Sequence, residues 1–145
     1  MERRFDIHIN TPQAAYIDDY AHHPEEIKSA ITSMRNIFPG RKLTAIFQPH
    51  LFTRTRDFAA EFAQSLSMLD ELVLLDIYPA RELPIEGVTS EIIFNKVTVG
   101  NKIMLKKEEV LDYLKEKDID ILVTFGAGDI DRLIVPIENL LKERI

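Results

Sequence analysis

The residues from Asp18 to Pro24, which read DDYAHHP, bring two carboxylates, a phenol and two imidazoles into one short segment. Carboxylates at such a position can hold ribose hydroxyls or a magnesium ion. A histidine can donate to a phosphate or hold an acyl oxygen. The same acids could simply cap the helix that follows. The residue types alone therefore leave a binding role and a structural role open.

A second group of candidates lies in residues 48–56, which read QPHLFTRTR. Arginine between a strand and a helix can bind a carboxylate or phosphate through two parallel hydrogen bonds. We expect Arg54 rather than Arg56 to serve in this way. Thr53 or Thr55 could cap the helix, whose amino end would add a site for negative charge. The structural alternative is a capped helix with solvated arginines, in which Arg56 pairs with the neighbouring aspartate.

Three further features are weaker candidates. The turn Gly126-Ala127-Gly128 would let backbone N–H groups approach a ligand at a helix start, although such turns are as often tight connections. Asp129 would cap that helix. Arg81 could reach a substrate or pair with Glu82, and His8 alternates with apolar residues, so it is expected to be exposed on an edge strand.

Composition and missing motifs exclude several classes of function. The chain has 145 residues, no cysteine and a net charge of -6, so disulfides and thiolate metal sites are absent and a general nucleic-acid binder is disfavoured. No apolar run is long enough for a membrane span or a signal peptide, which predicts a cytoplasmic domain. The sequence contains neither a P-loop motif nor a G-x-S-x-G motif, so it offers no nucleotide-phosphate loop and no visible nucleophile for hydrolysis.

Apolar residues follow strand and helix spacing in alternation along the chain. Strands are predicted at residues 5–9, 14–18, 43–47, 72–77, 102–105 and 119–125. Helical spacing is found at residues 24–38, 58–69, 89–97, 110–114 and 130–141, and Pro136 should kink or split the last of these helices. The pattern predicts a single α/β domain over residues 1–145. We expect a Rossmann-like, three-layer domain with a mostly parallel sheet, helices on both faces and an edge strand at the N-terminus.

In such a sheet the ligand site lies beyond the carboxyl ends of the strands. This rule selects four segments, namely residues 18–23, 48–56, 76–81 and 126–129.

Taken together, five motifs make the chain similar to the C-terminal domain of the UDP-N-acetylmuramate–L-alanine ligases, within the Mur ligase family. Arg3-Arg4-Phe5 resembles their RRF run, and Asp18 to Pro24 resembles DDY[GA]HHP. Residues 47–55 resemble FQPHR[FY]TRT, residues 77–90 resemble the motif YPAREXPIXGVTS, and residues 126–130 resemble GAGDI. The motifs occur in the family's order and span nearly the whole chain.

The resemblance implies a reaction and its partners. ATP phosphorylates the lactyl carboxylate of UDP-N-acetylmuramate, the amine of L-alanine attacks the acyl phosphate, and amide and phosphate result. In these ligases the N-terminal domain binds the UDP-sugar, and the central domain carries the P-loop and most ligands of Mg²⁺. The C-terminal domain receives the amino acid. The resemblance therefore implies that the UDP-binding and ATPase domains lie outside this chain, which alone should show no ligase activity and weak or undetectable ATP binding.

The family's functional residues can be carried over position by position. Asp19 resembles the acid that meets the ATP ribose, while Tyr20 and His22 resemble residues that face the reaction centre and the incoming alanine. Arg54 resembles an arginine that holds the alanine carboxylate or the transferring phosphate. No metal ligand is assigned. One departure is Leu51, where many members of the family have a second arginine. Either Arg54 and His50 suffice for the carboxylate, or another arginine substitutes.

Three other interpretations remain open from the sequence. The murein tripeptide-recycling ligase of the same family shares the acid-acid-aromatic-x-His-His-Pro motif, although residues 48–56 look more like the alanine-adding enzyme. A response-regulator receiver would use Asp18 and Asp19 for magnesium and Asp76 as phosphate acceptor, but it needs a lysine where this chain has Phe125-Gly126. A pure interaction domain would use the acid and histidine cluster for helix capping alone.

Overall fold

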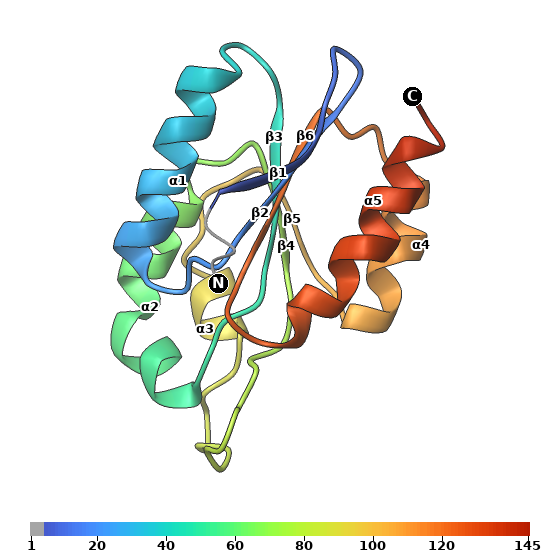
Figure 1. Cartoon of the computed structure of the whole chain (residues 1–145). Helices are drawn as coiled ribbons and strands as arrows, with labels where there is room; N and C mark the ends of the chain where they lie inside the picture. Colours follow the sequence, from blue (N-terminus) through green and yellow to red (C-terminus); the bar gives the residue numbers. More distant parts are fainter. Residues whose placement is uncertain (1–4) are drawn as a thin grey trace.

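A six-stranded sheet forms the centre of the computed structural model, which describes residues 5–145 (Figure 1). Its strands are β1 (Asp6–Asn10), β2 (Ala15–Asp19), β3 (Leu43–Phe47), β4 (Glu71–Leu74), β5 (Asn101–Met104) and β6 (Ile121–Phe125). Their order across the sheet is β1-β2-β6-β3-β4-β5. The edge strand β1 is antiparallel to β2, and the other neighbours are parallel. The predicted mostly parallel sheet with an N-terminal edge strand is confirmed. Arg3 and Arg4 of the RRF motif lie outside the described residues.

Helices cover both faces of the sheet, as predicted. One face carries α1 (Pro24–Ile37), α2 (Phe52–Leu66) and α3 (Glu91–Phe94). The other carries the 3₁₀ segment η1 (Lys107–Glu109), α4 (Val110–Lys115), the 3₁₀ segment η2 (Asp129–Leu133) and α5 (Ile134–Lys142). The chain crosses the sheet in one direction from β2 to β5 and then returns to β6. Because parallel crossovers are right-handed, this reversal places α4 on the opposite face, and α5, which follows β6, packs beside α4 on that face.

Two apolar cores result, one on each side of the sheet. Successive residues of a strand point to opposite faces, so Ala45 and Phe47 of β3 join the core under α1 and α2, whereas Ile46 joins the core under α5. Phe62 and Ile137, one from each helix layer, are fully buried. Each such side chain stabilises the fold by about 1.5–3 kcal/mol, so both helix layers are firmly held against the strands.

The edge strand β1 differs from the simple alternation expected of it. Its register with β2 shifts between Ile7 and Ile9, and as a result Ile7 is 44% exposed while Ile9 is buried. The prediction that His8 is exposed is wrong. Its ring stacks on Tyr16 at a centroid distance of 5.4 Å, and its Nδ1 lies 3.1 Å from Glu138 of α5. A bulge of this kind redirects side chains that strict alternation would leave in solvent.

The beginning of α2 is the largest error in the predicted element boundaries. Helical apolar spacing marked this helix only from Phe58, but it begins six residues earlier, at Phe52. Its first turns carry polar side chains and therefore show no apolar stripe. Phe58 itself has non-helical backbone angles (φ -122°, ψ 21°) and is 41% exposed, so it marks a kink rather than the buried face.

Two other elements were predicted too long. The strand predicted to reach Ile77 ends at Leu74, and the helix predicted over residues 89–97 is confined to Glu91–Phe94. The predicted break near Pro136 is confirmed, because the last helical region is split into η2 and α5. Pro136 lies in the first turn of α5, where the missing backbone N–H is tolerated.

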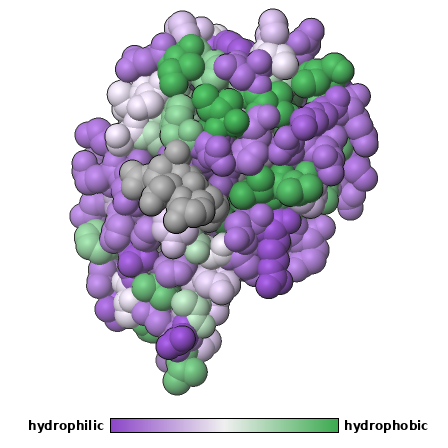
Figure 2. All heavy atoms as spheres, in the orientation of Figure 1, coloured by the Kyte–Doolittle hydropathy of each residue, from purple (hydrophilic) through white to green (hydrophobic). Residues whose placement is uncertain are grey.

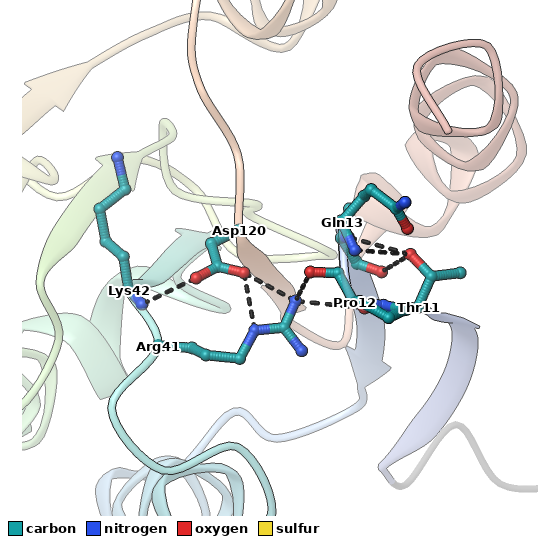
Figure 3. A network of polar contacts seen from close by, with 7 residues as sticks. Thr11, Pro12, Gln13, Arg41, Lys42 and Asp120 are labelled. Carbon is teal, nitrogen blue, oxygen red and sulfur yellow. Dashed lines mark hydrogen bonds and ion pairs between the residues drawn. The ribbon is translucent and has the colours of Figure 1, made fainter.

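A polar network joins the loops at the amino ends of the strands, far from the predicted ligand edge (Figure 3). Arg41 donates to the carboxylate of Asp120 through Nε at 2.8 Å, and to the carbonyl oxygen of Thr11 through Nη2 at 3.2 Å. The backbone N–H of Lys42 also donates to Asp120. These bonds connect the β1–β2 turn, the α1–β3 loop and the start of β6, so their role is structural.

The loop of residues 79–87 leaves the opposite edge. Figure 2 shows it as a narrow tip at the lower end of the molecule, which corresponds to the yellow-green loop of Figure 1. Leu83 in this loop is 83% exposed. Within residues 5–145, no helix is both long and apolar enough to cross a membrane.

Candidate active site

Aromatic and imidazole rings from three loops meet at the carboxyl edge of the sheet. The centroid of His22, after β2, lies 5.1 Å from that of Tyr20 and 5.9 Å from that of His50, after β3. The ring of His50 also stacks on Tyr78, after β4, at 5.7 Å. The structure thus brings together residues predicted from separate segments. Tyr78 was not among the predicted residues, although its position in the segment after β4 pointed to this edge.

The hydrogen bonds of His22 and His50 define different ring tautomers. Nδ1 of His22 lies 2.9 Å from the carbonyl oxygen of Tyr20, which can only accept, so this nitrogen carries a proton. Nδ1 of His50 lies 3.1 Å from Nη1 of Arg54, which can only donate, so this nitrogen accepts. In their neutral forms, His22 therefore has a basic Nε2, whereas His50 has an Nε2–H donor. The two adjacent rings offer one acceptor and one donor.

Electrostatics favours the neutral form of two histidines in this cluster. Burial lowers the pKa of His50 below its ordinary value, and the positive charge of Arg54 and the neighbouring His22 lower it further. Burial, Arg54 and His22 lower the pKa of His23 in the same order. His50 is thus neutral at pH 7, while Arg54 retains its charge. Positive charge at this edge comes from a guanidinium that can bind an anion without gaining a proton.

Asp18 and Asp19 are both buried, and neither is the cap of α1. Asp18 accepts a hydrogen bond from Thr124 of β6 at 2.7 Å. Asp19 accepts from the backbone N–H groups of Ala21 at 2.9 Å and Phe5 at 3.2 Å. The N-terminal cap of α1 is His23. The capping interpretation of the acids is therefore wrong, because both carboxylates instead fix the strand end and the loop that carries Tyr20 and His22. A cavity of about 330 Å³ between Asp19 and α1 adjoins this carboxylate.

The glycine turn after β6 is a close-packed connection. Gln48 donates from Nε2 to Asp129 at 2.7 Å, and its Oε1 accepts from the backbone N–H of Ile130 at 3.1 Å. A Cβ atom on Gly128 would lie 2.5 Å from the ring of Tyr78. Asp129 was predicted to cap a helix, but Gly128 holds the cap position, and the Asp129 carboxylate binds Gln48 and Lys107. Gln48 lies in the candidate segment of residues 48–56, but the sequence did not predict its partners, which are distant along the chain.

The amino end of α2 is capped from a distant loop. The carboxylate of Glu82 accepts from the backbone N–H of Phe52 at 2.6 Å and that of Thr53 at 3.1 Å, and from the hydroxyl of Thr53. The prediction that Thr53 or Thr55 caps this helix is wrong, because the Thr55 hydroxyl donates backwards to Leu51. Pairing with Glu82 was one of two alternatives for Arg81, but the Glu82 carboxylate instead binds the amino end of α2. The negative charge expected at the amino end of α2 is thus supplied by Glu82 of the same chain.

Arg54 and Arg56 have different surroundings. Arg56 pairs with Asp57 at 2.8 Å, and both side chains are about half exposed, as expected of a surface pair. Arg54 instead contacts the ring of His50. Leu51, which stands where the resembling family has a second arginine, has a positive φ of 77°. This conformation is unusual for a residue with a branched side chain, and it turns the chain sharply between His50 and the helix.

Comparison with known proteins assigns the family. The family described as "Mur ligase, glutamate ligase domain" matches residues 3–128. The chain belongs to the Mur ligase family. Curated relatives named UDP-N-acetylmuramate–L-alanine ligase include one from Parabacteroides distasonis, 57% identical over 143 residues, and one from Cytophaga hutchinsonii, 50% identical over 144 residues. Each match covers 99% of this chain but 31% of the relative.

Solved structures of Mur ligases share this fold. The UDP-N-acetylmuramate–alanine ligase of Thermotoga maritima aligns with a TM-score of 0.72 and 25% identity, over 99% of this chain and 30% of its own. A murein peptide ligase from Psychrobacter arcticus aligns with a TM-score of 0.75 and 19% identity, over 96% of this chain and 30% of its own. The resemblance inferred from the five motifs is confirmed: this is a Mur ligase C-terminal domain.

The same findings remove the receiver interpretation. Counted along the chain, the five parallel strands lie in the order 1-5-2-3-4, because β6 is inserted between β2 and β3. A receiver has the flavodoxin-like order 2-1-3-4-5. The acid pair and Asp76 therefore do not sit in a receiver sheet.

Proposed function

We propose that this chain is the amino-acid-receiving domain of an ATP-dependent ligase that joins L-alanine to UDP-N-acetylmuramate during peptidoglycan precursor synthesis. The relatives at 50–57% identity are named for this reaction. The observation that carries the proposal at the site is the contact between Arg54 and His50, with His22 beside them. This cluster combines a fixed positive charge, a hydrogen-bond donor and a base.

These groups match the two ends of an amino acid. The guanidinium of Arg54 and the Nε2–H of the neutral His50 can both donate to the alanine carboxylate. Nε2 of His22 can accept a proton from the alanine ammonium group, which must lose one proton before its nitrogen can attack an acyl carbon. The nitrogen loses a second proton once the bond to that carbon has formed. Tyr20, in edge contact with His22, lines the same place. In this scheme Arg54 and His50 bind and orient the substrate, and His22 is the general base.

The remaining reactants bind mainly outside this chain. ATP supplies the phosphoryl group that activates the lactyl carboxylate of UDP-N-acetylmuramate. Asp19, buried beside a cavity along α1, is proposed to accept from the ATP ribose. No group of three or more His, Asp or Glu side chains within residues 5–145 could hold a metal ion. Following the family resemblance, we assign most Mg²⁺ ligands and the P-loop to the central domain, and the UDP-sugar site to the N-terminal domain of the full-length ligase. We expect this chain alone to be inactive.

The test is phosphate release from ATP and Mg²⁺ in the presence of UDP-N-acetylmuramate. It compares L-alanine with murein tripeptide as acceptor, using both the full-length protein and this chain. We expect turnover with L-alanine by the full-length protein alone. Turnover with tripeptide but not with L-alanine would assign the recycling reaction instead, and turnover by this chain alone would contradict the division of the site between domains.

Two arginine variants form a matched pair for the site itself. Arg54→Lys keeps the charge but loses the planar fork, so KM for L-alanine should rise at least about tenfold. Arg56→Lys, on the same helix and paired with Asp57 in solvent, should leave KM unchanged. If His22→Ala and Arg54→Ala both retained full activity, the cluster would have a purely structural role.

A further inference from the structure

The part of α2 that carries Arg54 is a short segment with a break at each end. On one side Leu51 has a φ of 77°. On the other, Phe58 leaves the helical region of backbone angles. Residues 52–57 therefore form a separate helical piece, about a turn and a half long. A piece this short is not stable by itself, so the position of Arg54 depends on what holds the piece from outside.

No local side chain caps this segment. The residue at its cap position is Leu51, which has no side-chain acceptor. Glu82, 30 residues away from Phe52, supplies the cap instead through its bonds to the N–H groups of Phe52 and Thr53 and to the Thr53 hydroxyl. Hydrogen bonds from N–H groups to an ionised carboxylate are roughly twice as strong as neutral ones. The cap thus fixes the first turn at two successive backbone positions.

The charge of Glu82 suits this role. The bond from the Thr53 hydroxyl holds the pKa of the Glu82 carboxyl below its ordinary value, and the backbone N–H groups of Thr53 and Phe52 act in the same direction. The carboxylate is therefore ionised at neutral pH, at the helix end that favours negative charge. Since this end is filled by Glu82, a bound anion must be held by the side chain of Arg54 and not by the helix terminus.

The loop that carries Glu82 also holds the partner of Arg54. Its first part contains Tyr78, whose carbonyl oxygen accepts from the backbone N–H of Leu51 at 2.8 Å and whose ring stacks on His50. One loop after β4 thus fixes His50 through Tyr78 and the Arg54 segment through Glu82. The same loop therefore fixes the position of the Arg54 guanidinium relative to the His50 imidazole.

We propose that Glu82 is the positioning residue for Arg54, acting through the amino end of the segment of residues 52–57 and not by contact with substrate. This inference rests on the proposed function for its kinetic consequence. Loss of the cap frees the segment to shift, and a displacement of about 1 Å at a binding group can reduce rates roughly a hundredfold. The effect must appear in the binding of the group that Arg54 holds.

The experiment is a double-mutant cycle in the full-length ligase with substitutions at Glu82 and Arg54. Glu82→Ala should raise KM for L-alanine roughly tenfold to a hundredfold, with KM for ATP unchanged. Glu82→Gln keeps an oxygen acceptor for the two N–H groups and should give an intermediate KM. Glu86→Gln, an exposed acid in the same loop, is the matched control and should behave as the wild type.

The cycle separates a positioning role from general destabilisation. In the Arg54→Lys background, Glu82→Ala should cause little further rise in KM, because both changes damage the same interaction. Additive effects, or an unchanged KM in Glu82→Ala, would overturn the proposal. If Glu82→Ala fails to fold, Thr53→Val removes the hydroxyl donor alone and should still raise KM in an Arg54-dependent way. If Arg54→Lys itself leaves KM for L-alanine unchanged, the role given to Arg54 fails and the positioning proposal fails with it. Failure of the ligase function would instead appear as no turnover with L-alanine in the full-length protein.

Discussion

Nη1 of Arg54 lies 3.1 Å from Nδ1 of His50, a residue that precedes α2 in the sequence. This contact makes the imidazole accept from the guanidinium and lowers its affinity for a proton, in addition to the effect of burial. The arginine thus helps keep its neighbour neutral, with the ring proton on Nε2. The chemistry available at the site depends on the pair and not on either residue alone.

The titration of His50 should report this contact directly. Its pKa in the folded chain lies below the ordinary value of 6.5, mainly through burial and then through Arg54. In Arg54→Gln the pKa should rise towards 6.5 without reaching it, because the effect of burial remains. NMR titration of the imidazole protons measures the shift. An unchanged pKa in the variant would show that the guanidinium does not act on the ring.

The lowered pKa values of His50 and His23 also determine how stability changes near pH 6. Because the pKa of His50 and that of His23 are lower in the folded state, the unfolded chain binds more protons as pH falls below 6.5. The free energy of unfolding should therefore decrease from pH 7 to pH 5.5, and a His50→Gln variant should lose less over this interval. Urea unfolding at both pH values is the measurement. Equal losses in the two proteins would contradict the assignment.

Glu71, buried at the amino end of β4, should contribute to the loss of stability in acid. Burial alone would raise its pKa, but hydrogen bonds from Lys117 and Thr44 and the charge of Lys42 hold that pKa below 4.5. Its contribution to stability is therefore present above pH 4.5 and is lost as pH falls through the lower, folded-state pKa. Glu71→Gln should cost about 1–3 kcal/mol at pH 7 and flatten the loss of stability below pH 4.5.

The control for this substitution is Glu116→Gln, which changes an exposed acid. Its free energy of unfolding should stay within about 0.5 kcal/mol of the wild type. Chemical unfolding between pH 3 and pH 7 separates the two cases. A parallel acid response in Glu71→Gln and wild type would place the sensitive carboxyl elsewhere.

Gly128 should tolerate no side chain. A Cβ atom there would lie 2.5 Å from the Tyr78 ring and 2.6 Å from Oε1 of Gln48, and both neighbours are held by other contacts. Gly128→Ala should destabilise the chain by about 1–3 kcal/mol and disturb the His50 ring. Gly100→Ala adds a Cβ with nothing within 4 Å and should be nearly neutral. Thermal unfolding of the two variants tests the difference, and equal midpoints would show that the turn can open.

Arg41 should matter for stability and not for the reaction. Its bonds to Asp120 and Thr11 lie at the amino ends of the strands (Figure 3). The candidate site lies at the opposite, carboxyl ends of the strands. Arg41→Ala should cost about 1 kcal/mol, measured by urea unfolding, while KM for L-alanine in the full-length ligase stays unchanged. A raised KM without loss of stability would mean that this end of the sheet communicates with the site.

Local patterns in the sequence were sufficient to predict the three layers of the fold and the edge of the sheet at which the candidate site lies. The continuous apolar run of β3 predicts a strand that is covered on both faces. The 3.6-residue spacing of α1 predicts a helix with one buried face. Arg54 and His22 could be chosen because they follow such strands. Spacing fails where contacts are distant: Glu82 caps a helix 30 residues away, and Gln48 binds Ile130 across 82 residues.

Strand order was also beyond the reach of local pattern. Nothing in residues 121–125 places β6 between β2 and β3 rather than elsewhere in the sheet, since the interior strands of a covered parallel sheet are all apolar. The bulge in β1 and the positive φ of Leu51 likewise result from tertiary constraints, because a single residue's type does not specify them. The bulge lies in the edge strand β1, and Leu51 lies beside the candidate site.

The insertion of β6 between β2 and β3 sets the time at which this domain can fold during synthesis. β6 follows the other five strands in the sequence, and β2 and β3 have no hydrogen-bonded connection to each other without it. Until β6 emerges from a ribosome, β2 and β3 would each present an unpaired strand edge. The sheet of this domain can therefore close only after β6 has left the exit tunnel.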